Sequence, residues 1–395
     1  MRSLPSVRSA WRWMAGALLA AACATVALAQ SDRPIRVGAV SALGVQAGFP
    51  ESSQAARRYF DAVNAAGGVN GRRIEYVSLD EGPNPQTAAS AARRLIADPE
   101  VVALVGGSGL FDCPVNAAAY AAAGLVSLQG ASVAPECFAS SHIVPMNNGP
   151  YLGLENAVAY AVEQLKQQRV CLTVLDLPGM ASGYQRALAR LKPALKAALD
   201  DVAFIAPDAD FAAAVRERLA RRCGAIVFTG HEPTVLRWLD EAQKQGLGEV
   251  DWIFLTPAYT DRVAKAIRDP QARMHAMAEF EPWQSASLAM LDWKRVMREG
   301  NLPLSALSQG GYVSAQLFVR VARGINGPVS RASFTQALRE LPPTPLSFLG
   351  MPFHVGPAQA HAPNRASLPV VWRNGLWKIA APVWIQAPPL AAGPP

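Results

Sequence analysis

The feature that most constrains the fold is an alternation of short apolar segments with amphipathic segments, repeated in two separate runs. Short apolar segments predict strands, and apolar residues spaced three and four apart predict helices. In the first run these patterns predict strands at 35–40, 73–79, 101–105 and 125–128, and helices at 52–66, 86–97 and 114–123. Strands that alternate with helices of this length predict a parallel sheet with helices on both faces.

The alternation stops at VPMNNGPY, residues 144–151, which is rich in turn-forming residues. It resumes with helices expected at 152–166, 183–199, 209–222 and 233–245, and strands at 170–175, 202–205, 225–228 and 252–255. Two such runs, divided near residue 147, predict an α/β protein with two doubly wound parallel-sheet lobes. Helices at 285–299, 309–325 and 330–340, and short strands near 351–354 and 370–373, are expected to complete these lobes.

The first 29 residues have the composition of an export signal. Arg2, Arg8 and Arg12 precede an apolar run of 16 residues, which is short for a membrane span of about 20. We therefore expect residues 1–29 to be a signal peptide and the mature protein to be periplasmic. Cleavage before Cys23 with lipid attachment is the weaker alternative, because Ala20 is a poor substitute for leucine at such a site.

The charge of the chain argues against nucleic-acid binding. The formal net charge is +7, and removal of the three signal arginines leaves about +4. This excess is spread along the chain, without a basic block or an interleaved aromatic platform.

Motifs for catalysis and metal binding are weak. Residues 106–110, GGSGL, are similar to a nucleophile elbow, but Leu110 stands where the last glycine belongs. The five histidines show no paired spacing that would suit a metal. We therefore expect a protein that is not an enzyme and that needs neither metal nor cofactor. The glycine-rich turn at 106–110 would still present backbone N–H groups toward a ligand.

Three stretches together resemble the periplasmic solute-binding proteins of the leucine/isoleucine/valine-binding type. They are IRVGAVS at 35–41, DAVNAAGGVNGRRIEYVSLDEGPNPQTAASAARRLI at 61–96, and VVALVGGSG at 101–109. The middle stretch combines a helix, a Gly-Gly stop, an Asn-Gly turn, a strand and an acidic pair. The resemblance extends from about residue 33 to residue 380.

The resemblance implies the type I periplasmic binding protein fold, in which three crossover segments join two lobes. The crossings would fall near 145–149, 279–282 and 349–353. Lobe 1 would comprise 33–146 plus 283–348, lobe 2 would comprise 150–279 plus 352–383, and 387–395 would be a disordered tail. Such a protein is expected to be a monomer that closes on a small molecule by a hinge motion and delivers it to an ABC permease in the inner membrane.

The resemblance also places the ligand contacts in the loops that follow strands. Spacing puts them at 108–111 and 131–133 in the first lobe, and near 180, 231 and 259 in the second. The residues expected to contact ligand are Phe49, Ser108, Leu110, Phe111, Ala131, Ser132, Val133, Met180, His231 and Tyr259.

Several of these positions depart from the pattern of amino-acid-binding members. Leu110 and Val133 stand where hydroxyls would hold the α-carboxylate, and Ala258 stands where an acid would pair with the α-ammonium. A buried ammonium without a partner is very costly, so branched-chain amino acids should bind weakly unless Glu232 or Asp112 replaces the missing acid. The mostly apolar walls suit a neutral or singly anionic organic molecule.

Four cysteines remain after export: Cys113, Cys137, Cys171 and Cys223. An even number in an exported chain favours two disulfides over metal ligation, with buried free thiols as the alternative. Cys113 and Cys137 follow strands that should be sheet neighbours, which favours a bond between them. Cys171 and Cys223 stand at the entry of two second-lobe strands and form the second expected pair.

Two other functions stay open. The same clamp would serve as a sensor that signals to a membrane receptor, and neighbouring permease and ATPase genes would argue for transport instead. A secreted hydrolase of unrecognised type is disfavoured, because the nucleophile constellation is missing.

Overall fold

The computed structural model describes residues 33–44, 50–356, 361 and 363–387. The expected signal segment with Cys23, the ligand candidate Phe49 and the tail from residue 388 lie outside this part of the chain. Among the described residues, no helix combines the length and the apolar character that crossing a bilayer demands.

The first sheet contains five parallel strands in the order β2-β1-β3-β4-β5. The strands are β1 (Ile35–Ser41), β2 (Ile74–Asp80), β3 (Val101–Ser108), β4 (Ser127–Ala131) and β5 (Ile143–Pro145). Strand β3 is buried along its whole length, as a central parallel strand covered on both faces should be.

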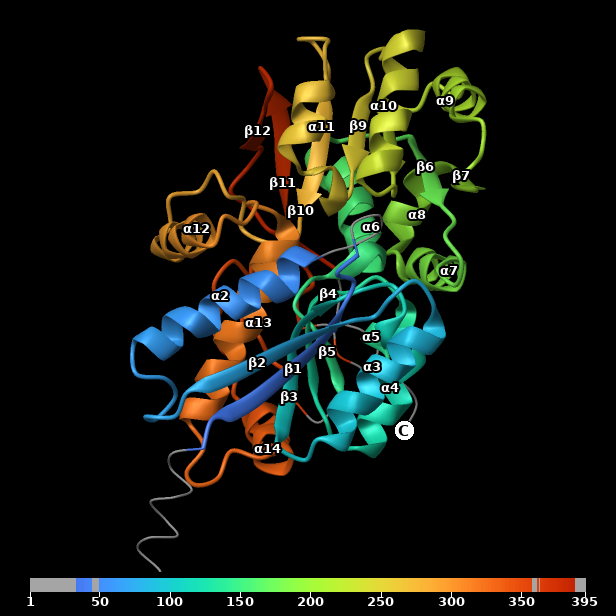
Figure 1. The fold of residues 1–395 in the computed structure, drawn as a ribbon. Coiled ribbons are helices and arrows are strands. Elements are labelled where there is room, and N and C mark those ends of the chain that lie inside the picture. The colour runs from blue at the N-terminus through green and yellow to red at the C-terminus, as the bar shows by residue number, and fades with distance from the viewer. Residues whose placement is uncertain (1–32, 45–49, 357–360, 362, 388–395) are drawn as a thin grey trace, which may run out of the picture.

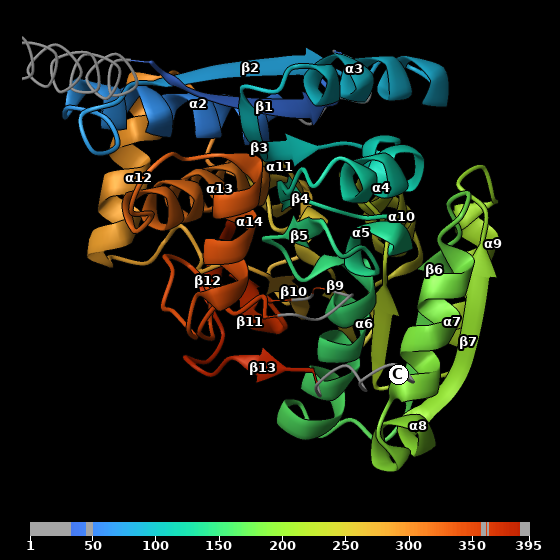
Figure 2. The same ribbon diagram turned by 90° about the horizontal axis from the view of Figure 1, so that it is seen from below.

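Helices cover both faces of this sheet (Figure 2). One face carries α2 (Pro50–Ala65), α13 (Ala306–Arg323) and α14 (Arg331–Glu340), and α12 (Leu288–Glu299) lies beside α2. The other face carries α3 (Pro85–Ala97), α4 (Asp112–Ala122) and α5 (Pro135–Phe138). Helices from residues 288–340 therefore return to the first sheet. The glycine-rich stretch after α2 is a helix end and a turn, as predicted, because Gly67 and Gly71 have φ of +98° and +81°.

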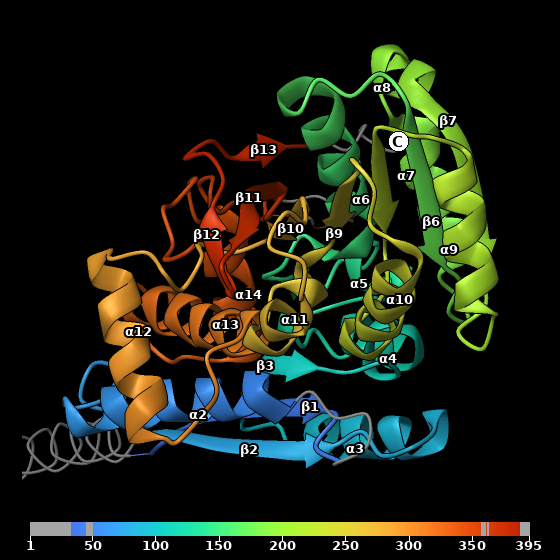
Figure 3. The same cartoon turned by 90° about the horizontal axis from the view of Figure 1, so that it is seen from above.

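The second sheet has the order β12-β11-β10-β9-β8-β6-β7. Its parallel part consists of β6 (Val170–Leu175), β7 (Leu199–Ile205), β8 (Ala225–Phe228), β9 (Asp251–Phe254) and β10 (Met274–Ala278). One face carries α6 (Gly149–Ala159, continued by a π-helical turn at Tyr160–Gln164), α7 (Ala181–Arg190) and α8 (Pro193–Ala198). The other carries α9 (Phe211–Ala220), α10 (Glu232–Gln245), the 3₁₀ turn η2 (Thr256–Ala258) and α11 (Asp261–Ala266) (Figure 3).

The second sheet is not wholly parallel, which corrects the expectation from the alternating pattern. Strands β11 (Ala366–Arg373), β12 (Leu376–Ile379) and β13 (Ile385–Gln386) add to it in antiparallel fashion. The turn between β11 and β12 is Asn374-Gly375, with φ of +53° and +80°, and an Asn-Gly pair between apolar segments is a strong hairpin signal. The predicted strand at 351–354 is wrong, since Phe353 makes only an isolated bridge with Thr344.

The predicted helix at 183–199 is divided into α7 and α8. Leu191 and Lys192 have extended ψ angles of 138° and 148° before Pro193. Proline disfavours the helical conformation of the residue before it, which explains the break.

Three connections run between the two sheets with their helices, which we call the first and second lobes. They join β5 to α6, β10 to α12, and α14 to β11. The connections lie side by side: the Gly149 N–H donates to Glu279 Oε2, Asn364 Nδ2 donates to the Glu279 carbonyl, and the Glu281 N–H donates to the Phe348 carbonyl. Three adjacent connections of this kind can act as a hinge between the lobes.

Candidate ligand-binding site

Strands of both sheets end at the space between the lobes (Figure 1). Strands β1 and β4 run toward the second lobe, and β9 and β10 run toward the first, so the loops after these strands face one another. Ligands of open α/β sheets bind at such carboxyl ends. The described residues that the sequence assigned to the ligand all lie in the segments that follow β3, β4, β6, β8 and β9, or at the last residue of a strand.

The N–H groups of the turn between β3 and α4 are occupied by the chain's own carboxylate. Glu81, which follows β2 and is 2% exposed, accepts hydrogen bonds from the backbone N–H groups of Leu110 (2.8 Å), Phe111 (3.1 Å) and Asp112 (3.0 Å). Burial raises the pKa of Glu81, and the three N–H donors oppose that rise. The carboxylate caps the positive end of α4, so the Leu110 N–H of the turn at 106–110 and the two N–H groups that follow it are paired within the protein.

Asp112 is also committed to the first lobe. Its Oδ1 accepts bonds from Asn116 Nδ2 (2.9 Å) and the Tyr120 hydroxyl (2.6 Å), and its Oδ2 accepts one from Gln129 Nε2 (2.7 Å). Burial raises its pKa, although these donors favour the charged form. Both oxygens of this buried side chain therefore have partners, which leaves little capacity for a ligand ammonium.

The loop after β4 reaches from the first lobe to the second. The backbone of Ser132 exchanges two hydrogen bonds with the Asn147 side chain, at 2.9 and 3.0 Å, and its own hydroxyl is buried without a partner among the described residues. Val133 packs against a hydrophobic cluster of the second lobe that contains Met180. The structure thus places Val133 against the cluster to which Met180 belongs, while Ser108 and Ala131 end their strands on the first-lobe side.

Two second-lobe candidates lie at the N-terminus of α10. His231 is exposed, and its Nδ1 shares a hydrogen bond with Thr234 Oγ1 (3.1 Å); partial burial lowers its pKa. Glu232 accepts a bond from Arg262 Nη1 at 3.2 Å, in an ion pair at the surface. Glu232 is therefore paired, and His231 has the freer side chain.

Tyr259 lies in the core of the second lobe. Its ring stacks on Trp283 with centroids 3.7 Å apart, and its hydroxyl donates to Gln284 Oε1 and accepts from the Trp283 N–H. Ala258, at the position where an acid would be expected, is fully buried. The Tyr259 hydroxyl, expected from the sequence to contact ligand, thus donates and accepts its hydrogen bonds within the protein.

A cavity of about 130 Å³ opens between the lobes, next to the first crossing. Pro135 and Phe138 of α5 form its first-lobe wall, and Tyr151, Leu152 and the arginines of α7, Arg186 and Arg190, form its second-lobe wall. None of these residues was predicted from the sequence to contact ligand. An arginine on a helix close to the hinge gives no signal until the fold places α7 opposite α5.

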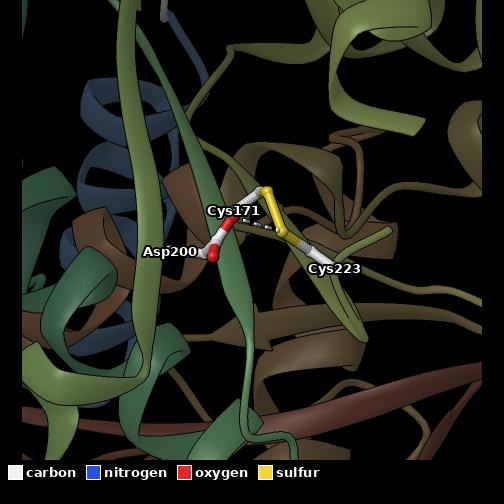
Figure 4. Close-up of side chains that lie close together, drawn as sticks. All are labelled: Cys171, Asp200 and Cys223. Atoms are coloured by element: carbon white, nitrogen blue, oxygen red, sulfur yellow. Dashed lines mark hydrogen bonds between the residues drawn. A yellow bond between two sulfur atoms is a disulfide. The ribbon is translucent and has the colours of Figure 1, made fainter. Parts of the chain in front are cut away.

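Both expected disulfides are present. Cys113 bonds to Cys137 with the Cα atoms 5.2 Å apart, and Cys171 bonds to Cys223 with the Cα atoms 5.8 Å apart. The first bond ties α5, which contains Cys137, to α4. Figure 4 shows Asp200 beside the second bond, with its Oδ2 3.8 Å from Cys223 Sγ. Two thiols and a carboxylate are groups that can bind a metal ion, and Cys171, Cys223 and Asp200 lie close together. The two sulfurs are, however, bonded to each other, and Asp200 forms an ion pair with Arg169.

Mass spectrometry of the non-reduced protein is expected to show two crosslinked peptide pairs, one containing Cys113 and Cys137 and the other Cys171 and Cys223. The reason is that each pair has its Cα atoms within the range of about 4.4–6.8 Å that a disulfide requires. Alkylation before reduction serves as the control, and labelling of all four thiols would contradict the assignment.

Comparison with known proteins identifies the family. The sequence profile of the family described as "Periplasmic binding protein" matches residues 34–375. The Leu/Ile/Val-binding protein of Escherichia coli K12 is 26% identical over 238 residues, which are 58% of this chain and 62% of that protein's length. The matched region thus falls short of two thirds of this relative.

Solved structures show the same fold at low sequence identity. A fatty acid ABC transporter substrate-binding protein from Thermomonospora curvata superposes with a TM-score of 0.74 at 18% identity, covering 88% of this chain and 91% of that one. The branched-chain amino acid transporter substrate-binding protein LivJ from Streptococcus pneumoniae, in complex with isoleucine, gives 0.71 at 17%, covering 90% and 100%. These likenesses confirm the expected type I fold.

The family match also confirms that the chain is not an enzyme, because periplasmic binding proteins hold their ligands without converting them. The match covers nearly all of the residues that the structure describes, in both lobes. This chain belongs to the periplasmic binding protein family.

Proposed function

We propose that this protein is the extracytoplasmic solute-binding component of an ABC importer, and that it captures a small organic solute between its two lobes. The main support is the architecture: the two sheets face each other and three adjacent connections join them. The chain also belongs to the periplasmic binding protein family. Hinge closure of such lobes buries a solute and creates a closed surface for a permease to recognise.

The periplasm is the proposed compartment. Family membership implies a location outside the cytoplasm. Two disulfides join all four cysteines of the described residues, and such bonds persist in oxidising compartments. The basic and apolar composition of residues 1–29 supports export by a signal peptide.

The proposed ligand is a neutral or singly anionic organic molecule rather than a branched-chain amino acid. Ala258 supplies no charge, and the two replacement acids weighed from the sequence, Glu232 and Asp112, are both engaged with other residues. Glu81 fills the N–H donors that a ligand carboxylate would otherwise meet at α4. The relatives' names differ in ligand, isoleucine in one and fatty acid in another, so the fold leaves the ligand open.

Leucine, isoleucine and valine are expected to bind at least a hundredfold more weakly than the micromolar affinity typical of capture. An unpaired ammonium in a closed site costs several kcal/mol, and about 1.4 kcal/mol is a factor of ten in affinity. Isothermal titration of the mature protein with each amino acid measures this. Micromolar binding of any of the three would show that another group replaces the missing acid.

The transport proposal is tested by finding a ligand and measuring closure. A library of organic acids, alcohols and amino acids, screened by thermal shift, should contain a solute that raises stability by about 2.7 kcal/mol at a hundredfold excess over Kd. Small-angle scattering with that solute should then show a smaller radius of gyration. An unchanged radius at saturation would count against closure of the lobes.

A further inference from the structure

We propose that the interlobe cavity beside the first crossing is an anion-binding subsite, and that it takes the carboxylate and the adjoining ring or short chain of a compact organic monoanion. The proposal rests on the proposed function and assigns the chemistry of its ligand. Arg186 and Tyr151 are the residues that would hold the carboxylate.

The cavity is built from both lobes, so a molecule in it touches each of them. Phe138 belongs to α5, which the Cys113–Cys137 bond holds against α4. Tyr151 belongs to α6, directly after the first crossing, and its ring lies edge-on to Phe138 with centroids 6.2 Å apart. A ligand between these walls therefore favours the closed arrangement, because it gains contacts only where both walls are present.

The rings of Phe138 and Tyr151 each pack directly against a glycine. A Cβ at Gly149, where φ is +73°, would lie 2.3 Å from the Phe138 ring, and a Cβ at Gly183 would lie 2.3 Å from the Tyr151 ring. Any larger residue at either position would displace a wall of the cavity. This close seating sets the position of both rings.

The polar groups of the cavity leave one cation and one hydroxyl available. Arg190 is paired with the buried Glu155, with Nε 3.0 Å from Oε1. Arg186 is exposed on α7 and makes no ion pair or hydrogen bond with the described residues. The Tyr151 side chain is 7% exposed, and its hydroxyl is buried with no partner in the described part of the chain. A tyrosine hydroxyl without a protein partner keeps its capacity to donate one hydrogen bond to a bound group.

A carboxylate satisfies both groups at once. The guanidinium of Arg186 would donate to it, and the Tyr151 hydroxyl would donate to a second lone pair. Burial raises the pKa of the Tyr151 hydroxyl, and the positive charge of Arg186, which lines the same cavity, opposes that rise. Glu136, which is exposed on α5, raises the pKa of the same hydroxyl. Its negative charge also weakens the attraction of the cavity for an anion.

The volume indicates the size of the group that fits inside the cavity. A cavity of about 130 Å³ is close to the engineered cavities of about 150 Å³ that accept benzene in other proteins. Pro135, Phe138 and Leu152 give that space apolar walls. A benzoate-sized anion fits this description, whereas a long hydrocarbon chain would extend out of the cavity.

Binding of benzoate, cyclohexanecarboxylate and hexanoate to the mature protein, measured by isothermal titration, tests the proposal, with benzamide as the neutral counterpart of benzoate. At least one anion should bind with a Kd below 1 mM, roughly tenfold more tightly than benzamide. Arg186→Gln should weaken that binding about tenfold and Tyr151→Phe about threefold, whereas Glu136→Gln should strengthen it. Arg216→Gln, an exposed arginine on α9 with no ion pair among the described residues, is the matched control and should leave the affinity unchanged.

The proposal is overturned if none of the three anions binds, or if they bind equally well to the wild type and to Arg186→Gln. The transport function fails separately. If another solute of the library binds and closes the lobes with an affinity that Arg186→Gln and Tyr151→Phe leave unchanged, the protein is a solute-binding component whose ligand lies elsewhere. If no solute of any class binds, the proposed function falls as well.

Discussion

Glu81→Ala is expected to lower the free energy of unfolding by about 3–5 kcal/mol, which is a large part of the stability of a typical lobe. The side chain is 2% exposed, and its carboxylate accepts three backbone N–H bonds at the start of α4. Alanine would leave these donors without a partner, and each buried donor left unpaired costs about 1–3 kcal/mol. Water that enters the vacated space would recover part of the loss.

Urea unfolding of the mature, disulfide-bonded protein measures this effect. Glu75→Ala is the matched control on β2, the strand that Glu81 follows, because Glu75 is exposed and makes only a surface ion pair with Arg36 at 3.6 Å. Its loss should change stability by about 0.5 kcal/mol or less. A similar small change in Glu81→Ala would show that the α4 donors do not depend on this carboxylate.

A small carboxylate provides a second and more specific readout. Formate should raise the melting temperature of Glu81→Ala more than chloride does at equal ionic strength, because helix N-termini favour anions and the variant has a vacant acceptor position. The wild type should respond equally to both salts. No difference between formate and chloride in the variant would mean that the three N–H groups do not form an anion site once Glu81 is absent.

The local sequence pattern was sufficient to predict most of the parallel strands of the two sheets. The strands that it did not predict have physical reasons for their weak signal. Strands β6 and β8 have the predicted bounds, because their apolar β-branched residues are buried on both faces and carry a strong signal. Strand β10 was missed: Met274-His-Ala-Met-Ala278 has no β-branched residue, and only pairing with β9 and β11 makes it a strand. The hairpin of β11 and β12 was also not predicted, although Asn374-Gly375 is a local signal for it.

The candidate site was less predictable, because spacing gives the position of a residue and not its partners. The loops that follow the strands were found, and both cysteine pairs followed from the sheet order. Glu81 is 29 residues from Leu110, and nothing in the sequence says that its carboxylate reaches the N-terminus of α4. Tyr259 is buried by a stacking contact with Trp283, and Arg186 meets α5 only through the placement of the lobes. Such contacts are tertiary and have no local signal.

The stability of the hinge is expected to depend on pH through Glu279. This residue follows β10 in the second crossing and is buried, and its Oε2 accepts a bond from the Gly149 N–H of the first crossing at 3.3 Å. Burial raises its pKa from 4.5 to about 7, while the donors of Gly149, Asn147 and Asn148 oppose the rise. Its backbone carbonyl accepts from Asn364 in the third connection, so the residue touches all three.

The sign of the effect follows from the two pKa values. Below pH 4.5 the carboxyl is protonated in both the folded and the unfolded chain. Between 4.5 and about 7 the unfolded chain releases the proton while the folded protein keeps it, so the free energy of unfolding falls as the pH rises. A separation of about 2.5 pH units at about 1.4 kcal/mol per unit gives an upper limit of about 3 kcal/mol for this loss.

Glu279→Gln removes the titration and keeps the size of the side chain. Relative to the wild type, the variant should gain up to about 3 kcal/mol in the free energy of unfolding between pH 5 and pH 8, because the wild type alone must bury a charge at the higher pH. Urea unfolding at intervals of half a pH unit measures the difference between the two proteins. Glu249→Gln, at an exposed position of the same lobe, is the control and should keep the wild-type pH profile. Parallel profiles for the wild type and Glu279→Gln would mean that water reaches the carboxylate between the crossings, so that its burial does not hold the proton.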